Sequence, residues 1–153
     1  MSVALLERPS ARHAGAAVVR PLAAPDQGGG WSPPPRPARP VLVVDDDPTI
    51  RAFVVEALTD DGYAVVQAGD GEEALQLCAT AEPCVVLLDM RMPVVDGWEF
   101  ARRFRERPGR LPPVVVMTAA RDADAWADEI GADGTLAKPF DIDDLLAIVE
   151  RFC

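Results

Sequence analysis

Histidine and lysine are nearly absent from this chain of 153 residues. The single histidine is His13, so the rest of the chain has no imidazole for a catalytic triad, a metal site or a phosphohistidine relay. The single lysine is Lys138, whereas arginine occurs 14 times. Because an ammonium group is a compact point charge that arginine does not imitate, the position of Lys138 needs an explanation.

Positive charge and long apolar runs are also scarce. There are 15 basic against 25 acidic residues, and the formal net charge is −10. This balance argues against nucleic acid as a partner, because phosphate binding needs clustered positive charge. No apolar run approaches the roughly 20 residues of a membrane span, so we expect no membrane contact.

Cysteine occurs three times, as Cys78, Cys84 and Cys153. The number is odd and the spacing matches no metal site. The pattern therefore predicts a reduced, cytoplasmic protein in which Cys78 and Cys84 are thiols of the core.

The first 40 residues differ in composition from the rest. They contain eight of the 15 prolines and carry five arginines against two acidic residues, whereas residues 41–153 carry 10 basic and 23 acidic residues. No apolar period runs through this first segment. We therefore predict a disordered tail over 1–40, followed by one domain over 41–153.

Strand and helix patterns alternate five times within residues 41–153. Strands are predicted at 41–44, 64–68, 85–88, 114–117 and about 135–137, and helices begin near 48, 71, 97, 122 and 142. This alternation predicts an α/β fold, with a parallel sheet that is covered by helices on both faces.

Polar residues stand at the predicted carboxyl ends of these strands: Asp45 and Asp46, Asp89, Thr118 and Lys138. Ligands of open parallel sheets bind at this edge. Converging carboxylates repel one another, and a divalent cation relieves the repulsion. Oxygen ligands without imidazole or thiolate favour Mg²⁺ or Mn²⁺. With an ammonium and a hydroxyl nearby, the set suits phosphoryl chemistry, and any of the aspartates is a candidate nucleophile.

Five short motifs at these positions resemble the receiver domain of two-component response regulators. They are Val44-Asp45-Asp46-Asp47-Pro48, Leu88-Asp89-Met90-Arg91-Met92-Pro93, Asp96-Gly97, Met117-Thr118-Ala119 and Lys138-Pro139-Phe140. The resemblance covers residues 41–153. It implies a flavodoxin-like (βα)5 fold, a doubly wound parallel sheet with the strand order 2-1-3-4-5.

The resemblance also implies a role for each acidic residue. Asp89 would be the phospho-acceptor that becomes an aspartyl phosphate. Asp46, Asp89 and the main-chain carbonyl of Arg91 would be direct Mg²⁺ ligands, and Asp45 would assist through a water molecule.

Further roles are implied at the last two strands. Thr118 and Lys138 would contact the phosphoryl group, and the Lys138–Pro139 peptide bond would be cis. The family often has an aromatic residue three positions before the lysine, whose burial follows the threonine toward the phosphate. Thr135 stands there in this chain, so the aromatic part of the switch is absent.

The function implied is that of a stand-alone response regulator, because the chain ends just after its fifth helix. It would accept a phosphoryl group from a sensor histidine kinase or a histidine phosphotransfer protein, and it would signal by binding an unknown protein target. It would assist its own phosphorylation and dephosphorylation without turning over an external substrate. Weak homodimer formation through the last two helices is a further hypothesis.

Two other functions compete with this interpretation. Asp45, Asp47 and Thr49 also fit the opening motif of haloacid-dehalogenase-like phosphatases, with Asp45 as nucleophile and Asp47 as acid and base. Those enzymes insert a flap after the first strand, whereas a helix is predicted here from Pro48. The second alternative is a receiver-like module that does not use phosphate.

Simple structural roles compete at single residues. Asp47 is expected to cap the following helix, which begins at Pro48. Thr118, taken alone, is better explained as a cap for the helix near Asp122 than as a catalytic hydroxyl.

Overall fold

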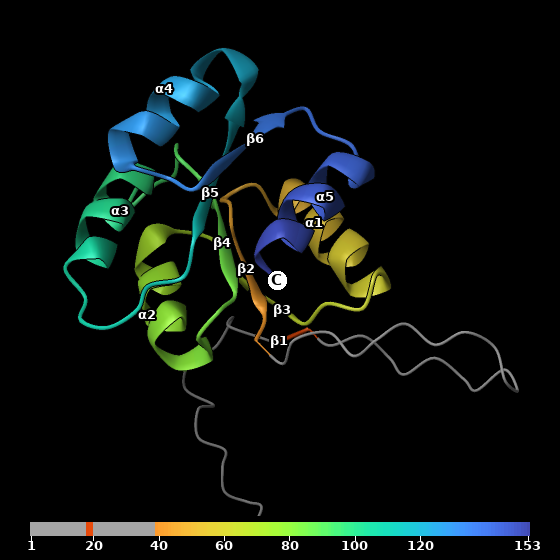
Figure 1. The fold of residues 1–153 in the computed structure, drawn as a ribbon, viewed down its shortest axis with the longest axis horizontal. Coiled ribbons are helices and arrows are strands. Elements are labelled where there is room, and N and C mark those ends of the chain that lie inside the picture. Colours follow the sequence, from red (N-terminus) through yellow and green to blue (C-terminus); the bar gives the residue numbers. More distant parts are fainter. Residues whose placement is uncertain (1–17, 20–38) are drawn as a thin grey trace, which may run out of the picture.

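The computed structural model describes residues 18–19 and 39–153 (Figure 1). Their elements, in chain order, are β1 (Val18–Val19), β2 (Val41–Val44), α1 (Pro48–Asp60), β3 (Val65–Ala68), α2 (Gly71–Ala81), β4 (Val85–Asp89), α3 (Gly97–Arg105), β5 (Val114–Ala119), α4 (Ala120–Ile130), β6 (Gly134–Lys138) and α5 (Ile142–Phe152). The predicted strand–helix alternation is therefore present from β2 to α5. No helix in these residues is long and apolar enough to cross a membrane.

The strands form one sheet in the order β1-β3-β2-β4-β5-β6. Every pair between β3 and β6 is parallel. Counted along the chain, these five parallel strands have the order 2-1-3-4-5, which confirms the predicted flavodoxin-like topology. From β2 the chain goes to β3 on one side and later to β4 on the other. The carboxyl ends of β2 and β4 therefore flank a topological switch point, where open sheets place their ligand sites.

One edge of the sheet carries a strand that the sequence did not indicate. Val18 and Val19 pair antiparallel with Val66 and Val65 of β3. These two residues belong to the segment for which we predicted disorder. Residues 1–17 and 20–38 of that segment lie outside the described residues.

Helices cover both faces of the sheet, with α1 and α5 on one face and α2, α3 and α4 on the other (Figure 1). Strand β2 divides its side chains between them. Leu42 and Val44 lie in the core beneath α2, α3 and α4, and Val41 and Val43 lie in the core beneath α1 and α5. Because successive side chains of a strand point to opposite faces, a strand that is buried on both faces must be apolar throughout.

Aspartate side chains cap four of the five helices found in residues 39–153. Asp47, Asp70, Asp96 and Asp141 each accept a hydrogen bond from a backbone N–H of the following turn. These contacts satisfy donors that the start of a helix leaves without a partner. The predicted cap at Asp47 is confirmed. Helix α4 is the exception, because it begins at Ala120 with no side-chain cap.

The structure corrects the prediction that the cysteines are reduced thiols. Cys84, expected to be a thiol, forms a disulfide with Cys153. Only Cys78 is free, and it is buried as predicted. The two bonded residues are 69 positions apart, and their Cα atoms lie 5.6 Å from each other, within the range for a bridge. Local spacing cannot indicate this pair, because it forms only where the start of β4 meets the end of α5.

The close approach between Gly97 and β4 can be tested by substitution. A Cβ at Gly97 would lie 2.7 Å from the Cα of Met90, directly after the strand that carries Asp89. We expect Gly97→Ala to lower the free energy of unfolding by about 1–3 kcal/mol, because the backbone of that strand must shift. Urea denaturation measures the change. Gly69→Ala is the control, since its Cβ would meet only the Arg51 side chain at 3.4 Å. Equal losses in both variants would contradict the packing argument.

Candidate phosphoryl-transfer site

Three carboxylates meet at the carboxyl ends of β2 and β4. The register pairs Val44 with Leu88, so the aspartates that follow, Asp45 and Asp89, stand at the same level of the sheet. One ligand atom from each of Asp45, Asp46 and Asp89 lies within 4.8 Å of the others. The predicted cluster is therefore formed by the pairing of β2 and β4, which are adjacent in the sheet although the two aspartates are 44 positions apart in the sequence.

Burial separates the three acids. Asp45 is 1% exposed and Asp89 is 8% exposed, whereas Asp46 is exposed to solvent. Buried carboxylates are costly unless they are paired or bind a metal ion. An oxygen cluster that is open on the side of Asp46 fits a hard divalent cation such as Mg²⁺, which keeps several water ligands.

Lys138 supplies the positive charge of this site. It ends β6, and its Nζ donates a hydrogen bond to Oδ2 of Asp45 at 2.8 Å. The same Nζ lies 3.7 Å from Oδ1 of Asp89. The side chain is 22% exposed, so the ammonium is partly desolvated and its attraction to the two carboxylates is strengthened. The Lys138–Pro139 peptide bond is cis. The only lysine of the chain thus faces the acid cluster.

Burial raises the pKa of Asp89 to about 6. The repulsion from the neighbouring Asp45 acts in the same direction. Lys138 and a hydrogen bond from the backbone N–H of Arg91 lower the pKa in part. The carboxylate is therefore ionised near neutral pH, although burial and Asp45 make its ionised form unfavourable. A cation bound beside it would lower this free-energy cost, and a covalent phosphoryl group would change it.

Thr118 lies in β5, next to the strand of Asp89, and is 6% exposed. The alternative role as a helix cap is not found, because α4 has no side-chain cap at its start. Its hydroxyl is thus not used by the following helix.

An aromatic cluster beside the site was not anticipated as a unit. The Arg91 guanidinium lies over the Trp126 ring, 4.9 Å from its centroid. Trp126 packs edge-on against Trp98 with centroids 4.9 Å apart, and the Trp98 indole N–H donates to Glu129 at 2.7 Å. This cluster connects the loop after β4 with α3 and α4. Sequence spacing could not reveal it, because its members come from three separate segments.

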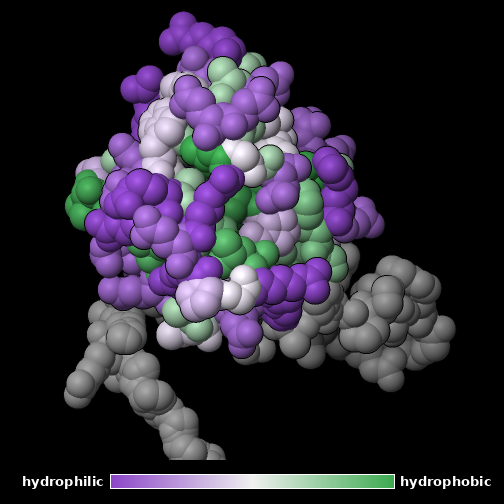
Figure 2. Space-filling view, turned by 60° about the vertical axis from the view of Figure 1, so that its left-hand side comes forward, coloured by the Kyte–Doolittle hydropathy of each residue, from purple (hydrophilic) through white to green (hydrophobic). Residues whose placement is uncertain are grey.

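Thr135 lies away from the acid cluster. It lines a polar hollow of about 480 Å³ together with Asp128, Asp133 and Arg151, between α4, β6 and α5. A second hollow, of about 520 Å³, lies between α3 and α4 and is lined in part by Phe104, Leu111 and Ile130. Figure 2 shows apolar side chains in a hollow on that side of the molecule, with hydrophilic side chains around it. Neither hollow contains a member of the acid cluster.

The fold and the acid cluster define a class: an α/β protein with an acidic, lysine-containing site at the switch point of a doubly wound sheet. A family model of the response regulator receiver domain matches residues 41–150. The chain belongs to this family of two-component signalling domains, as the motifs around Asp45, Asp89 and Lys138 indicated.

Curated relatives are longer than the matched region. The chain is 39% identical over 115 residues to the transcriptional regulatory protein PdtaR of Mycobacterium tuberculosis, which covers 73% of this chain and 55% of PdtaR. It is 42% identical over 113 residues to the DNA-binding transcriptional regulator NtrC of Escherichia coli, which covers 72% of this chain and 24% of NtrC. The chain thus spans between a quarter and about half of the length of these relatives.

Solved structures of similar length share the fold. The chemotaxis response regulator CheY4 of Vibrio cholerae is 34% identical, with a TM-score of 0.69 over 76% of this chain and 100% of that chain. The receiver domain of NtrX from Brucella abortus is 30% identical, with a TM-score of 0.66 over 72% of this chain and 95% of that chain. Both similarities confirm the fold that was predicted from the strand–helix alternation.

The raised pKa of Asp89 predicts a pH-dependent stability in metal-free buffer. The folded state favours the protonated form of Asp89 more than the unfolded state does. The contribution of this residue to the free energy of unfolding is therefore fully present below about pH 4 and is lost as the pH rises through about 6. Asp89→Asn removes this loss. We expect the variant to exceed the wild type by about 1–3 kcal/mol in free energy of unfolding at pH 7.5, and by little at pH 4.

Denaturant titrations with a chelator present, repeated across this pH range, measure the difference. The exposed Asp143 provides the control, because Asp143→Asn removes a carboxylate outside the cluster. If the Asp89→Asn difference stayed constant from pH 4 to 7.5, the burial of an ionised Asp89 would not be its cause.

Proposed function

We propose that Asp89 accepts a phosphoryl group from a phosphohistidine of a histidine kinase or a histidine phosphotransfer protein. The observation that carries the proposal is the Lys138 ammonium, which lies within 4 Å of both the buried Asp45 and the buried Asp89, at 2.8 and 3.7 Å. A carboxylate oxygen of Asp89 forms the new bond to phosphorus while the bond from phosphorus to the donor's imidazole nitrogen breaks. The single histidine of the sequence, His13, lies outside the described residues, and we propose a donor on another protein.

The acid cluster would hold Mg²⁺, or Mn²⁺, during this transfer. Asp46, Asp89 and the main-chain carbonyl of Arg91 are the proposed direct ligands, and Asp45 would assist through water. When bound, the cation neutralises the phosphoryl oxygens and lowers the repulsion among the acids. The position of Asp46 supports this role, because it is the exposed member of the cluster.

Lys138 and Thr118 are proposed to contact the phosphoryl group. The Lys138 Nζ already lies 3.7 Å from Asp89, so a small rotation would bring it to an oxygen of a phosphoryl group on that residue. It would then exchange its ion pair with Asp45 for one with the phosphoryl group. Thr118 would donate its hydroxyl hydrogen, which no cap of α4 requires.

Signalling would then proceed by protein–protein binding. Phosphorylation shifts an equilibrium between two conformations, and hydrolysis of the aspartyl phosphate restores the first. The protein would assist both reactions on itself without turning over an external substrate. A kinase donor places this exchange in the cytoplasm. The same proposal includes a domain boundary at residue 41, an unknown protein target and weak self-association through the last two helices.

The phosphatase alternative is not favoured by any contact in the site. It requires Asp45 as nucleophile and Asp47 as acid and base. Asp45 is 1% exposed and is paired with Lys138 at 2.8 Å. Asp47 accepts hydrogen bonds from the backbone N–H groups of Thr49 and Ile50, which holds it at the start of α1.

Incubation with acetyl phosphate and Mg²⁺, followed by intact mass measurement, tests the proposed acceptor. We expect one added phosphoryl group on the wild type and none on Asp89→Asn. Asp47→Asn is the matched control, because asparagine caps a helix as well as aspartate does and phosphorylation should persist. Chelation of Mg²⁺ should abolish the addition in every protein.

Two outcomes would contradict the proposal. Phosphate on Asp89→Asn but not on Asp45→Asn would make Asp45 the acceptor and revive the phosphatase hypothesis. No addition to the wild type, while CheY4 of Vibrio cholerae is labelled under the same conditions, would favour a module that does not use phosphate.

The small side chain of Thr135 predicts a limited response on the face formed by α4, β6 and α5. Without an aromatic ring that moves between exposed and buried positions, few contacts on this face depend on Thr118. We expect amide chemical-shift changes on phosphorylation to be smaller near Thr135 than near Asp89, as measured by two-dimensional NMR. Changes around Thr135 that rival those near Asp89 would show that the switch operates without the aromatic residue.

A further inference from the structure

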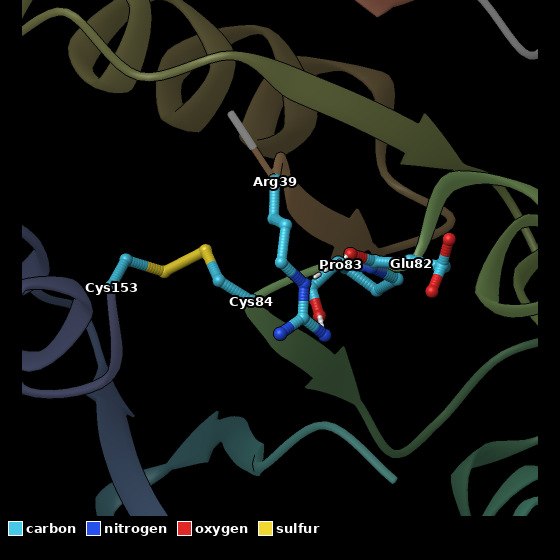
Figure 3. Close-up of a disulfide and its surroundings, with 5 residues drawn as sticks. All are labelled: Arg39, Glu82, Pro83, Cys84 and Cys153. Carbon is cyan, nitrogen blue, oxygen red and sulfur yellow. Dashed lines mark hydrogen bonds between the residues drawn. A yellow bond between two sulfur atoms is a disulfide. The ribbon is translucent and has the colours of Figure 1, made fainter. Parts of the chain in front are cut away.

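A disulfide stands at the end of the sheet opposite the acid cluster. Cys84 directly precedes β4, whose other end carries Asp89, and Cys153 directly follows α5. Figure 3 shows the bond joining the start of the green strand to the end of the blue helix. The bond thus ties the last helix to a central strand without contacting the proposed phosphoryl site.

The position of Cys84 is held by contacts other than the disulfide. The Arg39 guanidinium donates from Nε to the carbonyl of Glu82 at 2.9 Å, and from Nη2 to the carbonyl of Pro83 at 3.0 Å (Figure 3). The backbone N–H of Cys84 donates to the carbonyl of Pro40 at 2.9 Å. These three bonds hold the segment before β4 against the segment before β2.

The position of Cys153 is held in the same way. Its backbone N–H donates to the carbonyl of Val149 at 2.9 Å, which continues the hydrogen-bond pattern of α5. Leu145 and Val149 of this helix are fully buried against the sheet. Both cysteines are therefore positioned by bonds and packing that do not depend on the disulfide, so the bond can open and close without refolding of the domain.

The three cysteines have different environments. Burial in α2 raises the pKa of Cys78 to about 12, so this residue stays a protonated thiol at neutral pH. Cys84 is 7% exposed, whereas Cys153 is half-buried at the end of the chain described here. Cys153 is thus the more exposed residue of the pair, and Cys78 is a buried reference thiol in the same molecule.

We propose that Cys84 and Cys153 form a reversible redox site, which takes a small-molecule disulfide such as oxidised glutathione as its oxidant. Disulfides of cytoplasmic proteins are mostly transient. The inference rests on the proposed function in this respect, because a kinase partner in the cytoplasm makes a reversible bond the expected kind. The redox site itself needs neither Asp89 nor a metal ion.

The oxidation has two exchange steps. The Cys153 thiolate attacks one sulfur of glutathione disulfide, a mixed disulfide forms, and one glutathione thiolate leaves. The Cys84 thiolate then attacks the Cys153 sulfur, and the second glutathione leaves. The protein loses two electrons and two protons and gains one S–S bond, and one glutathione disulfide becomes two molecules of reduced glutathione.

The consequence is a restraint on α5. The closed bond fixes the end of this helix to β4, whereas in the dithiol form the last turn is held only by its own hydrogen bonds and packing. We expect hydrogen exchange of the amides in that turn to be several-fold slower in the oxidised protein. Phosphoryl uptake from acetyl phosphate should be the same in both forms, because the bond lies at the far end of β4.

The test is a glutathione titration of the whole chain. Protein equilibrated at different ratios of reduced to oxidised glutathione is quenched with acid, denatured, alkylated with a maleimide and weighed by mass spectrometry. We expect one alkylated thiol, Cys78, in oxidising mixtures and three in reducing mixtures, with both forms populated between them. Asp89→Asn should titrate identically, so that failure of the phosphorylation proposal would not change this result.

Two variants separate a positioned pair from an incidental one. Arg39→Ala removes the donors that hold Glu82 and Pro83, so several-fold more oxidised glutathione should be needed for half-oxidation. Arg121→Ala is the control, because its side chain is 88% exposed and lies in the first turn of α4, at the carboxyl end of β5 and so at the sheet edge opposite the disulfide. The effect of Arg39→Ala is measured as the ratio of reduced to oxidised glutathione at half-oxidation. A general loss of folding stability that left the two cysteines in place would not change this ratio.

Three outcomes would overturn the proposal. Three alkylated thiols in every mixture, or glutathione adducts without the internal bond, would mean that the two cysteines do not pair. A disulfide that persists in a large excess of reduced glutathione would make the bond a permanent structural one. Equal rates of hydrogen exchange for the α5 amides in the oxidised and the dithiol protein would show that the disulfide does not restrain this helix.

Discussion

The repulsion among Asp45, Asp46 and Asp89 is the constraint on which the site depends. The parallel pairing of β2 with β4 brings these acids to one edge of the sheet, where ligand atoms of all three lie within 4.8 Å of one another. Lys138 offsets part of the repulsion through its 2.8 Å bond to Asp45. Burial and the remaining repulsion together raise the pKa of Asp89, so its carboxylate is stabilised by any positive charge that approaches it.

The surrounding fold serves to hold that unfavourable arrangement in place. Strands that are apolar on both faces are clamped between two helical layers, and this burial stabilises the domain against the cost of the charged cluster. Gly97 lets α3 begin directly against Met90, and Asp96 caps that helix, so the loop after Asp89 is fixed on both sides. The metal and phosphoryl chemistry that we propose would use the free energy stored in these close carboxylates.

Strand β4 links two different sites. Its carboxyl end carries the acid cluster, and its amino end follows the cysteine that bonds to the end of α5. The Arg91–Trp126 contact leads from the first of these ends toward α4. Both contacts thus join an end of this strand to a helix: the disulfide to α5, and the Arg91–Trp126 contact to α4.

The sequence by itself determined the strand–helix order, the sheet topology and the residues at the strand ends, because each rests on local periodicity or on motifs that stand in order along the chain. Single-residue roles such as the Asp47 cap were also readable, since a cap contacts only the next turn. The tertiary structure decided what depends on distant segments: the Lys138–Asp45 ion pair, the Arg91–Trp126 cluster and the raised pKa of Asp89. It also decided the Cys84–Cys153 bond, for which local spacing predicted free thiols. Cys84 and Cys153 are 69 positions apart and meet only when the sheet and its helices have packed. A local sequence pattern therefore cannot indicate that they are neighbours.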